Sequence, residues 1–221
     1  MGIKEKAKEI FDIAAEPTVD IVSSMFLEGV VGSVVPGAVS AVLAYKQKRQ
    51  ERNYEKFMEI TNERCQELED KLEKLSEVSR RKFITEYFGI VSDYVLDEKQ
   101  EEKIKYIVNG FINLASIENS KEDFVLTYYD TLKELRMVDI AVLRTYKDID
   151  LQLNDVMRDF DLDEDQLTAV KNKLVRQNLL YYVDGSAIMD GTMLIKKRTH
   201  SRYGLSGYGD AFLKFFTTRY I

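Results

Sequence analysis

Near its N-terminus the chain contains a long run of apolar residues. Residues 21–45 carry hydrophobic or small side chains on all sides of a helix, and Glu28 is their only charge. Pro36 and Gly37 interrupt the run, and proline lacks the backbone donor that a helix interior needs. The run therefore predicts either one kinked helix or a hairpin of two short helices. A charged helical pattern over residues 4–16 precedes it.

From residue 54 to residue 75 the apolar positions are spaced alternately four and three residues apart. These positions hold Tyr54, Met58, Thr61, Cys65, Leu68, Leu72 and Leu75. Charged side chains fill the other faces, and this heptad pattern predicts a long helix with one apolar seam. We expect the seam to pack on another helix or on a second copy of the chain.

Residues 83–137 repeat apolar side chains at helical spacing and predict three packed helices. The three stripes are Phe83, Ile84, Tyr87, Phe88, Val91 and Tyr94; Ile104, Ile107, Val108, Phe111, Ile112 and Ala115; and Phe124, Tyr128, Leu132 and Leu135. Asp97 is a candidate N-cap for the second helix, and Ser120 with Asp123 resembles a capping box for the third. Aromatic side chains at this spacing commonly form a core, so the stripes predict a helical bundle.

The last third of the chain combines helix and strand signals. The predicted elements are helices over residues 138–146, 151–160 and 163–179 and strands over residues 178–183 and 192–197. Asp-Gly dipeptides between the strands favour turns. Ser206 is a candidate N-cap for a closing helix. The order helix, helix, helix, strand, strand is typical of a winged helix-turn-helix.

Together these patterns predict a mainly α protein with three regions. Residues 1–53 hold the N-terminal helix and a helical apolar hairpin, residues 54–137 the long heptad helix and a helical bundle, and residues 138–221 a winged-helix-like module with a small β-wing. A chain of 221 residues suffices for one or two domains. The single cysteine, Cys65, excludes an internal disulfide and indicates a reducing compartment.

Small residues in the apolar segment recur at every fourth position. On a continuous helix they form one smooth stripe, which consists of Gly29, Ser33, Gly37 and Ala41 and is widened by Gly32. Such a stripe lets helix backbones approach closely and drives helix association in lipid. The seventeen residues from 29 to 45 carry no charge, which places the segment at the short limit for a membrane-spanning helix.

Charged residues flank this segment on both sides. A basic cluster of the kind expected at a cytosolic membrane flank follows it and consists of Lys46, Lys48, Arg49 and Arg52. Glu28 lies on the other side, and a carboxylate at the centre of a bilayer costs about 2.5–3.5 kcal/mol. Pro36 also opposes a permanent span. We therefore expect either conditional membrane insertion or a buried hairpin packed through its glycines.

Positive charge is concentrated at the C-terminal end of an acidic chain. The net charge is −6, but residues 166–221 contain nine Lys and Arg against three Asp, so they carry +6 and the preceding residues carry −12. The basic candidates are Lys171, Lys173 and Arg176 on the predicted recognition helix and Lys196, Lys197, Arg198 and Arg202 on the predicted wing. They suit contacts with phosphates, whereas the acidic residues between 155 and 165 would repel DNA. Winged helices also dock on proteins, so both interpretations stay open.

The sequence singles out no catalytic or metal-binding residue. It contains no Walker loop, nucleophile elbow or metal-ligand spacing. Residues 159–165 alternate carboxylates but lack the Gly and Glu that an EF-hand requires, so they predict a solvated capping stretch. His200, the only histidine, is far from Cys65 in sequence, which argues against a Cys–His dyad. We expect no enzyme activity, no cofactor and no metal.

Four phrases in the second half of the chain resemble one known family. They are Lys105–Ala115, Phe124–Leu135, Met137–Leu143 and Leu205–Leu213. Over residues 104–216 the pattern resembles the abortive-infection alpha type of phage-resistance protein, in which two such helical phrases precede a small C-terminal module. The resemblance implies antiphage defence in a bacterial host or prophage, and it transfers no active-site residue.

Three hypotheses for the function follow from these features. In the leading one, a cytoplasmic effector senses a phage protein through its C-terminal region, and residues 21–45 then oligomerise and permeabilise the inner membrane. The alternative is a winged-helix DNA-binding transcription regulator that dimerises through residues 54–75. The third is a protein that binds only another protein and requires neither lipid nor DNA.

Overall fold

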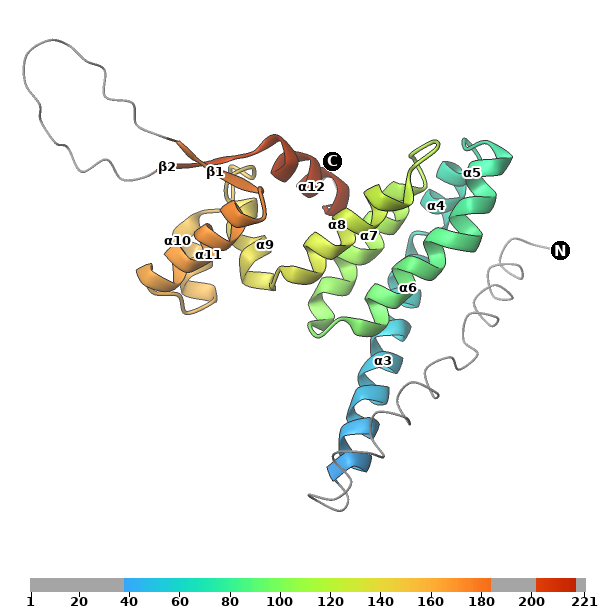
Figure 1. The fold of residues 1–221 in the computed structure, drawn as a ribbon, viewed down its shortest axis with the longest axis horizontal. Helices are drawn as coiled ribbons and strands as arrows, with labels where there is room; N and C mark the ends of the chain where they lie inside the picture. Colours follow the sequence, from blue (N-terminus) through green and yellow to red (C-terminus); the bar gives the residue numbers. More distant parts are fainter. Residues whose placement is uncertain (1–37, 184–201, 218–221) are drawn as a thin grey trace, which may run out of the picture.

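The fold is mainly helical, as the sequence predicts, with one small antiparallel sheet (Figure 1). The computed structural model describes residues 38–183 and 202–217. The predicted helix over residues 4–16 and the first part of the apolar segment, including the turn predicted at Pro36, lie outside the described residues.

A long helix, α3, spans Ala38–Glu63, and α4 follows over Cys65–Leu72. Arg64 separates the two helices, because its backbone angles (φ −112°, ψ 21°) are not helical. The single helix predicted over residues 54–75 is therefore wrong: that stretch belongs to two helices, and the first already includes Ala38. The predicted boundary between residues 53 and 54 falls inside α3.

The following helices pack with α3 into a bundle. Their bounds are Glu77–Lys82 (α5), Phe83–Tyr87 (η1, a π-helical turn), Phe88–Asp97 (α6), Glu101–Lys103 (η2, a 3₁₀ turn), Ile104–Leu114 (α7) and Glu122–Glu134 (α8). From η1 to α8 the helical segments lie where the apolar stripes predict three helices, which confirms that part of the prediction, whereas α5 precedes the first stripe.

The buried face of α3 matches the predicted seam only in part: Thr61 is buried as predicted, but Asn53 and Phe57 are buried instead of their neighbours Tyr54 and Met58. Asn53, Phe57 and Thr61 are buried at four-residue spacing, whereas the seam residue Met58 is only partly buried. The ring centroid of Phe57 lies 5.6 Å from that of Phe111 on α7. This face turns inward because it places the large Phe57 ring in the aromatic core, between α6 and α7.

Two helix caps predicted in the bundle are wrong. Asp97 is the last residue of α6, and its carboxylate accepts a 3.1 Å hydrogen bond from a lysine of α8 instead of capping α7. The N-cap residue of α8 is Lys121, so Ser120 and Asp123 form no capping box. The Ser120 carbonyl instead accepts hydrogen bonds from side chains of α5 and η1. These tertiary partners are not encoded by the local sequence.

The last region contains three helices, the sheet and a closing helix. Their bounds are Met137–Arg144 (α9), Leu153–Asp159 (α10), Glu164–Arg176 (α11), Leu180–Val183 (β1), Arg202–Leu205 (β2) and Gly207–Phe216 (α12). In the antiparallel sheet Leu180 pairs with Leu205 and Val183 with Arg202. The strand predicted over residues 192–197 lies outside the described residues, and the segment that pairs with β1 is β2.

Two local caps in this region agree with the sequence. Ser206 is the N-cap of α12, and its Oγ accepts a 2.8 Å hydrogen bond from the backbone of Gly209. Asp163 caps α11 and forms a reciprocal capping box with Gln166. The acidic stretch thus contains a helix cap, as predicted.

The closing helix α12 lies against α7 and α8 and joins the last region to the bundle (Figure 1). Asn109 and Asn113 of α7 donate hydrogen bonds to the carbonyls of Phe216 (3.0 Å) and Phe215 (2.8 Å). Gly110 between them permits the close approach, because a Cβ there would lie 2.5 Å from the Phe216 ring. The buried residues of both regions consequently form one continuous core.

Candidate functional site

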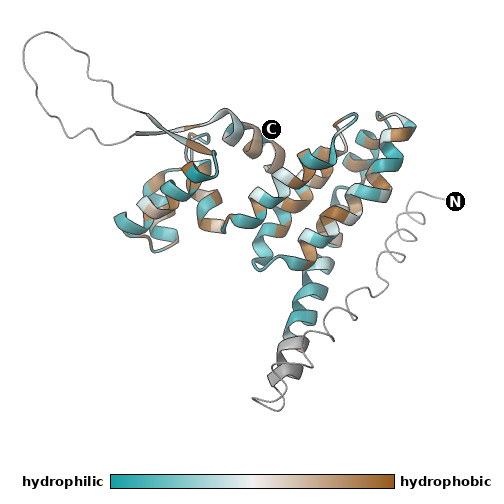
Figure 2. Ribbon diagram, viewed as in Figure 1, coloured by the Kyte–Doolittle hydropathy of each residue, from teal (hydrophilic) through white to brown (hydrophobic). Residues whose placement is uncertain are grey.

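The first turns of α3 extend beyond the bundle, and the part next to the bundle is hydrophilic (Figures 1 and 2). Tyr45, Lys46 and Lys48 are exposed there, with Tyr45 at 70%. Arg52 forms a 2.7 Å ion pair with Glu101 at the edge of the bundle. Within the basic cluster, Lys46 and Lys48 therefore lie on the part of α3 that extends beyond the bundle, whereas Arg52 contacts the edge of the bundle.

Next to Arg52, the buried side-chain amide of Asn53 holds α3 to the bundle. The Nδ2 atom of Asn53 donates to the carbonyls of Val95 (3.0 Å) and Glu98 (2.8 Å), where α6 ends. The side chain of Asn53 is almost completely buried. It therefore connects the helix that carries the basic cluster to the corner between α6 and η2.

The predicted membrane-association residues divide into two groups. Glu28, Gly29, Gly32, Ser33 and Gly37 lie outside the described residues, whereas Ala41 stands in the first turn of α3. Arg49 is partly buried, unlike its exposed neighbours in the basic cluster. Within residues 38–183 and 202–217, no helix is both long and apolar enough to cross a membrane.

Two of the three basic residues of the predicted recognition helix α11 have partners within the protein. The Lys173 ammonium forms a 2.6 Å ion pair with Asp139, which is buried on α9. The Lys171 ammonium lies 5.5 Å from the centre of the Tyr203 ring, and burial lowers its pKa. Arg176 is exposed. Of these three cations, Arg176 therefore has the most accessible side chain.

The other residues proposed for contact with nucleic acid or protein are only partly described. Lys196, Lys197 and Arg198 lie outside the described residues, and Arg202 stands in β2. Glu164 and Asp165 are exposed on the first turn of α11. A DNA backbone that approached this end of α11 would meet negative charge.

Two tyrosines and an asparagine form a polar surface beside α11. The hydroxyls of Tyr182 and Tyr203 donate to Oδ1 of Asn172 at 2.7 and 3.3 Å. Tyr182 and Tyr181 are each about half exposed. Gly204 opposite Tyr181 has no side chain, which leaves room for that ring to lie across the sheet. The face presents aromatic rings with polar ends, a type common in protein interfaces.

A buried charge cluster that the sequence analysis missed joins the two regions. Lys103 and Glu98 form a 2.7 Å ion pair with side chains that are 1% and 7% exposed. Burial lowers the pKa of Lys103, while Glu98 opposes this change; Asp139 and Lys173 also act on it electrostatically. Lys103 and Glu98 are typical surface residues by type, so only their tertiary partners identify them.

The described side chains suggest no catalytic centre. The Cys65 thiol donates a 3.3 Å hydrogen bond to Glu69, and His200 lies outside the described residues. In the part of the chain that the structure describes, no group of three or more His, Cys, Asp or Glu residues could hold a metal ion. The features that remain are surfaces and charges suited to binding.

No protein-family model, curated protein or solved structure matches this chain. The function is therefore argued from the residues and their placement.

Proposed function

We propose that this protein is a membrane-directed effector of antiphage defence. In this proposal the C-terminal region senses a phage protein, and the apolar segment then oligomerises through its small-residue stripe and disrupts the inner membrane. The resemblance of residues 104–216 to the abortive-infection alpha type supports the biological setting. The observation that carries the membrane role is the exposed, basic end of α3.

The side chains at this end have the chemistry of a membrane interface. Tyr45 is 70% exposed, and the exposed Lys46 and Lys48 follow it. Tyrosine rings are enriched at the headgroup level, and lysines at the cytoplasmic flank of inserted segments. Residues 46–52 extend about 10 Å along the helix, at 1.5 Å per residue, which is enough to cross the headgroup layer of one leaflet, about 5–8 Å thick. The bundle would then stand just outside the bilayer.

We infer that residues 137–217 form a winged-helix module that recognises a protein rather than DNA. The order of α9, α10, α11, β1 and β2 supports the winged-helix assignment. Two features argue against DNA binding by α11: Lys173 is already ion-paired with Asp139, and the first turn of the helix is acidic. The half-exposed Tyr181 and Tyr182 favour a protein partner.

A continuous set of contacts connects this module to the membrane-directed helix. Phe215 and Phe216 of α12 bind Asn113 and Asn109 on α7 through their carbonyls. Phe111 on the same helix packs against Phe57 of α3. A partner that displaced α12 would therefore disturb the helix on which α3 rests. This arrangement supports a sensor that releases the apolar segment.

Dye release from liposomes of bacterial lipid tests the membrane role. The full-length protein is added over a concentration series, with and without lysate of phage-infected cells. The Gly29→Leu/Gly37→Leu double variant is expected to lose leakage, because leucine prevents close helix approach. Gly89→Leu is the matched control and should leak like the wild type, since Gly89 is exposed and a Cβ there meets nothing within 4 Å. Circular dichroism verifies that each variant folds.

The outcomes separate the hypotheses. Leakage by the wild type that the double variant lacks supports the proposal. Absence of leakage in both conditions, or equal leakage by the double variant, contradicts it. Fluorescence anisotropy with a DNA duplex tests the alternative. Salt-dependent binding that Lys171→Ala/Arg176→Ala weakens would favour the transcription regulator.

A further inference from the structure

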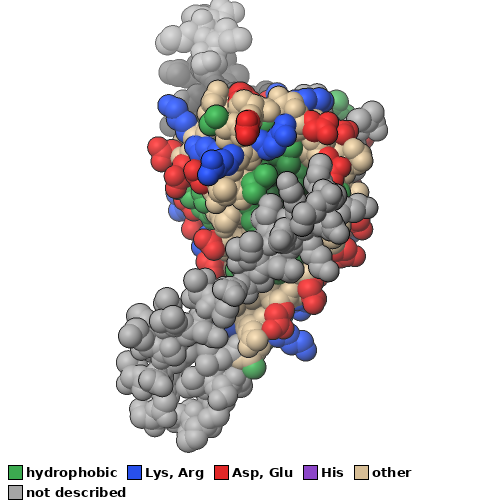
Figure 3. All heavy atoms as spheres, turned by 90° about the vertical axis from the view of Figure 1, so that its right-hand side faces the viewer, with side chains coloured by type: hydrophobic (Ala, Val, Ile, Leu, Met, Phe, Trp, Pro, Cys, Tyr) green, Lys and Arg blue, Asp and Glu red, His purple; other side chains and the backbone are tan. Residues whose placement is uncertain are grey.

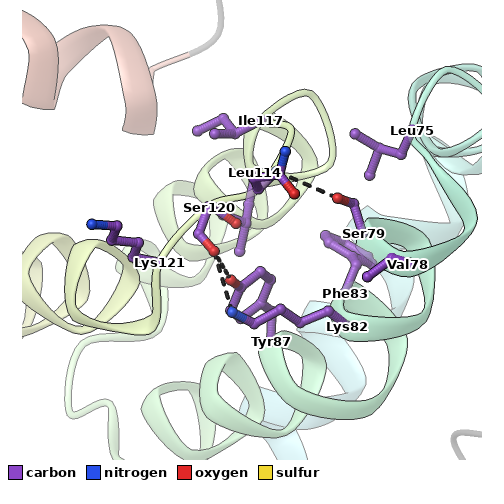
Figure 4. Close-up of a pocket in the computed structure, with 11 residues that line it drawn as sticks. Leu75, Val78, Ser79, Lys82, Phe83, Tyr87, Leu114, Ile117, Ser120 and Lys121 are labelled. Carbon is purple, nitrogen blue, oxygen red and sulfur yellow. Dashed lines mark hydrogen bonds between the residues drawn. The ribbon is translucent and has the colours of Figure 1, made fainter.

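A pocket of about 200 Å³ lies between α5, η1 and the loop that joins α7 to α8 (Figure 4). Leu75, Phe83, Leu114 and Ile117 supply apolar walls, and the exposed Val78 stands at its rim. Figure 3 shows the side of the molecule at the right of Figure 1, where hydrophobic side chains lie among Lys, Arg, Asp and Glu side chains. None of these pocket residues belongs to the sites described above.

An uncommon backbone feature builds one wall of the pocket. Phe83–Tyr87 is a π-helical turn, in which the Phe88 amide donates to the Phe83 carbonyl five residues earlier. The turn places both Phe83 and Tyr87 against the pocket. Single π-helical turns are rare and occur often at functional sites. The wider turn is one reason to expect a ligand here.

The polar end of the pocket is formed by Lys82 and Tyr87, which both donate to the Ser120 carbonyl (Figure 4). The Lys82 hydrogen bond is 3.3 Å long, and Lys82 also forms a 3.9 Å ion pair with Glu86, whose side chain is half exposed. An ammonium group has three donors, so Lys82 retains the capacity to bind an anion. Glu118, on the neighbouring loop, does not line the pocket.

The Glu118 carboxylate is occupied by two serines beside the pocket. The hydroxyls of Ser76 and Ser79 donate to it at 2.5 and 2.6 Å. These bonds lower the pKa of Glu118 and hold it as a charged acceptor. They also attach the α7–α8 loop to the start of α5, and the bonds of Lys82 and Tyr87 to Ser120 attach the same loop at the other end of the pocket.

We propose that this pocket binds a small amphiphilic carboxylate, with its aliphatic chain among the apolar walls and its carboxylate on Lys82. A volume of 200 Å³ holds about seven water-sized groups, which corresponds to a chain of about six carbons. The apolar walls favour the chain, and a charge-assisted hydrogen bond from Lys82 selects the carboxylate over a neutral head group. This inference is independent of the membrane role.

Methyl-detected NMR of the full-length protein, labelled at Ile, Leu and Val, tests the proposal with hexanoate as the probe. Saturable shifts are expected at Val78, Leu114 and Ile117, whose methyl groups line the pocket. Hexan-1-ol is the neutral probe of equal length and should bind about tenfold more weakly. Lys82→Met should weaken hexanoate about tenfold and leave the alcohol unchanged.

Lys121→Met is the matched control, because Lys121 lies at the same pocket but its ammonium points away from the others in Figure 4. It should bind hexanoate like the wild type. Val78→Trp should cover the pocket and abolish the shifts at Leu114 and Ile117 without changing the core, since Val78 is 76% exposed. Equal affinity for acid and alcohol, equal effects of the two lysine variants, or shifts that persist in Val78→Trp would each overturn the proposal.

Discussion

Gly209, in the first turn of α12, lies against the backbone of the segment that leads into β1. A Cβ at this position would be 2.2 Å from the Leu179 carbonyl oxygen, a backbone atom that cannot move aside like a flexible side chain. The Ser206 cap bonds to the same residue, so the start of α12 is fixed on both sides. The absence of a side chain at Gly209 is therefore a packing requirement.

We expect Gly209→Ala to lower the free energy of unfolding by about 2–3 kcal/mol, because the added methyl overpacks this contact. Gly207→Ala, two residues earlier, should change it by less than about 0.5 kcal/mol, since a Cβ there meets nothing within 4 Å. Urea unfolding followed by circular dichroism measures both. Equal losses in the two variants would contradict the steric explanation.

Buried tyrosines make the protein sensitive to alkaline pH. Burial raises the pKa of Tyr146 to about 12 and raises that of the fully buried Tyr129 well above its ordinary value. Above pH 10 the unfolded chain loses these protons while the folded chain retains them. Stability is therefore expected to fall as the pH rises from 10 to 12.

The urea midpoint measured between pH 9 and pH 12 tests this sign. The urea midpoint of Tyr146→Phe should fall less steeply above pH 10 than that of the wild type, because the variant lacks one group whose pKa differs between the folded and unfolded states. Tyr181→Phe, at an exposed strand position, should follow the wild-type curve. A Tyr146→Phe curve parallel to the wild type over the whole range would contradict the assignment.

At the scale of elements, α3 illustrates how a periodic pattern can be placed on the wrong face. Met58 belongs to the predicted heptad seam, whereas Phe57, next to it, is completely buried. The heptad register places Met58 on the apolar seam, whereas the buried register combines Phe57 with the polar Asn53 and Thr61 and is not marked by an apolar pattern. The aromatic rings of α6 and α7 decide between them, because Phe57 fills the space among them.

We expect Phe57→Ala to lower the free energy of unfolding by about 3–5 kcal/mol, as for other large buried aromatic residues. Met58→Ala should cost about 1 kcal/mol, because its side chain is only partly buried. Thermal or urea unfolding measures the difference, and Phe57→Leu provides a milder change of the same sign if the alanine variant does not fold. A larger loss for Met58→Ala would restore the predicted seam.

At the scale of the whole molecule, the ion pair between Lys173 and Asp139 connects α11 with α9 next to the bundle. Its geometry is short, at 2.6 Å, and Asp139 is buried. The nearby pair of Lys103 and Glu98 lies within the bundle corner. The two pairs form a charged junction between the regions, and each charge depends on its partner to offset burial.

Lys173→Met should lower the free energy of unfolding by roughly 2–3 kcal/mol, because it removes the ion-pair partner of the buried Asp139 carboxylate; breaking a fully buried pair costs about 3–5 kcal/mol. The partial exposure of Lys173 reduces the effect. Arg176→Met, one turn along the same helix and exposed, is the matched control.

Hydrogen exchange measured by mass spectrometry locates the effect. Faster exchange in α9 and α11 is expected for Lys173→Met, with a smaller change in α7, because the loss occurs at the junction and not in the aromatic core. An exchange pattern identical to that of Arg176→Met would show that the ion pair does not hold the module in place.

Features that arise within one turn of helix or along one segment could be predicted from the amino-acid sequence. The apolar stripes predicted the helices of the bundle, and Ser206 was found as a cap because its hydroxyl bonds to an amide only three residues on. The acidic first region and the basic end of the chain are also properties of the sequence alone. Such features depend on neighbouring residues, so no knowledge of the fold is needed.

Long-range packing, by contrast, sets which side chains are bound to other parts of the protein and which are accessible. Asp97 and Ser120 have the right residue types for caps but bond to other elements instead. From the sequence Lys173 is expected to be a free surface cation, but in the fold it binds Asp139, which is 34 residues away. Asn109 pairs with Phe216 across 107 residues. Contacts at such separations follow from the packing of helices, which a local pattern does not specify, and they determine which face of each helix is available for binding.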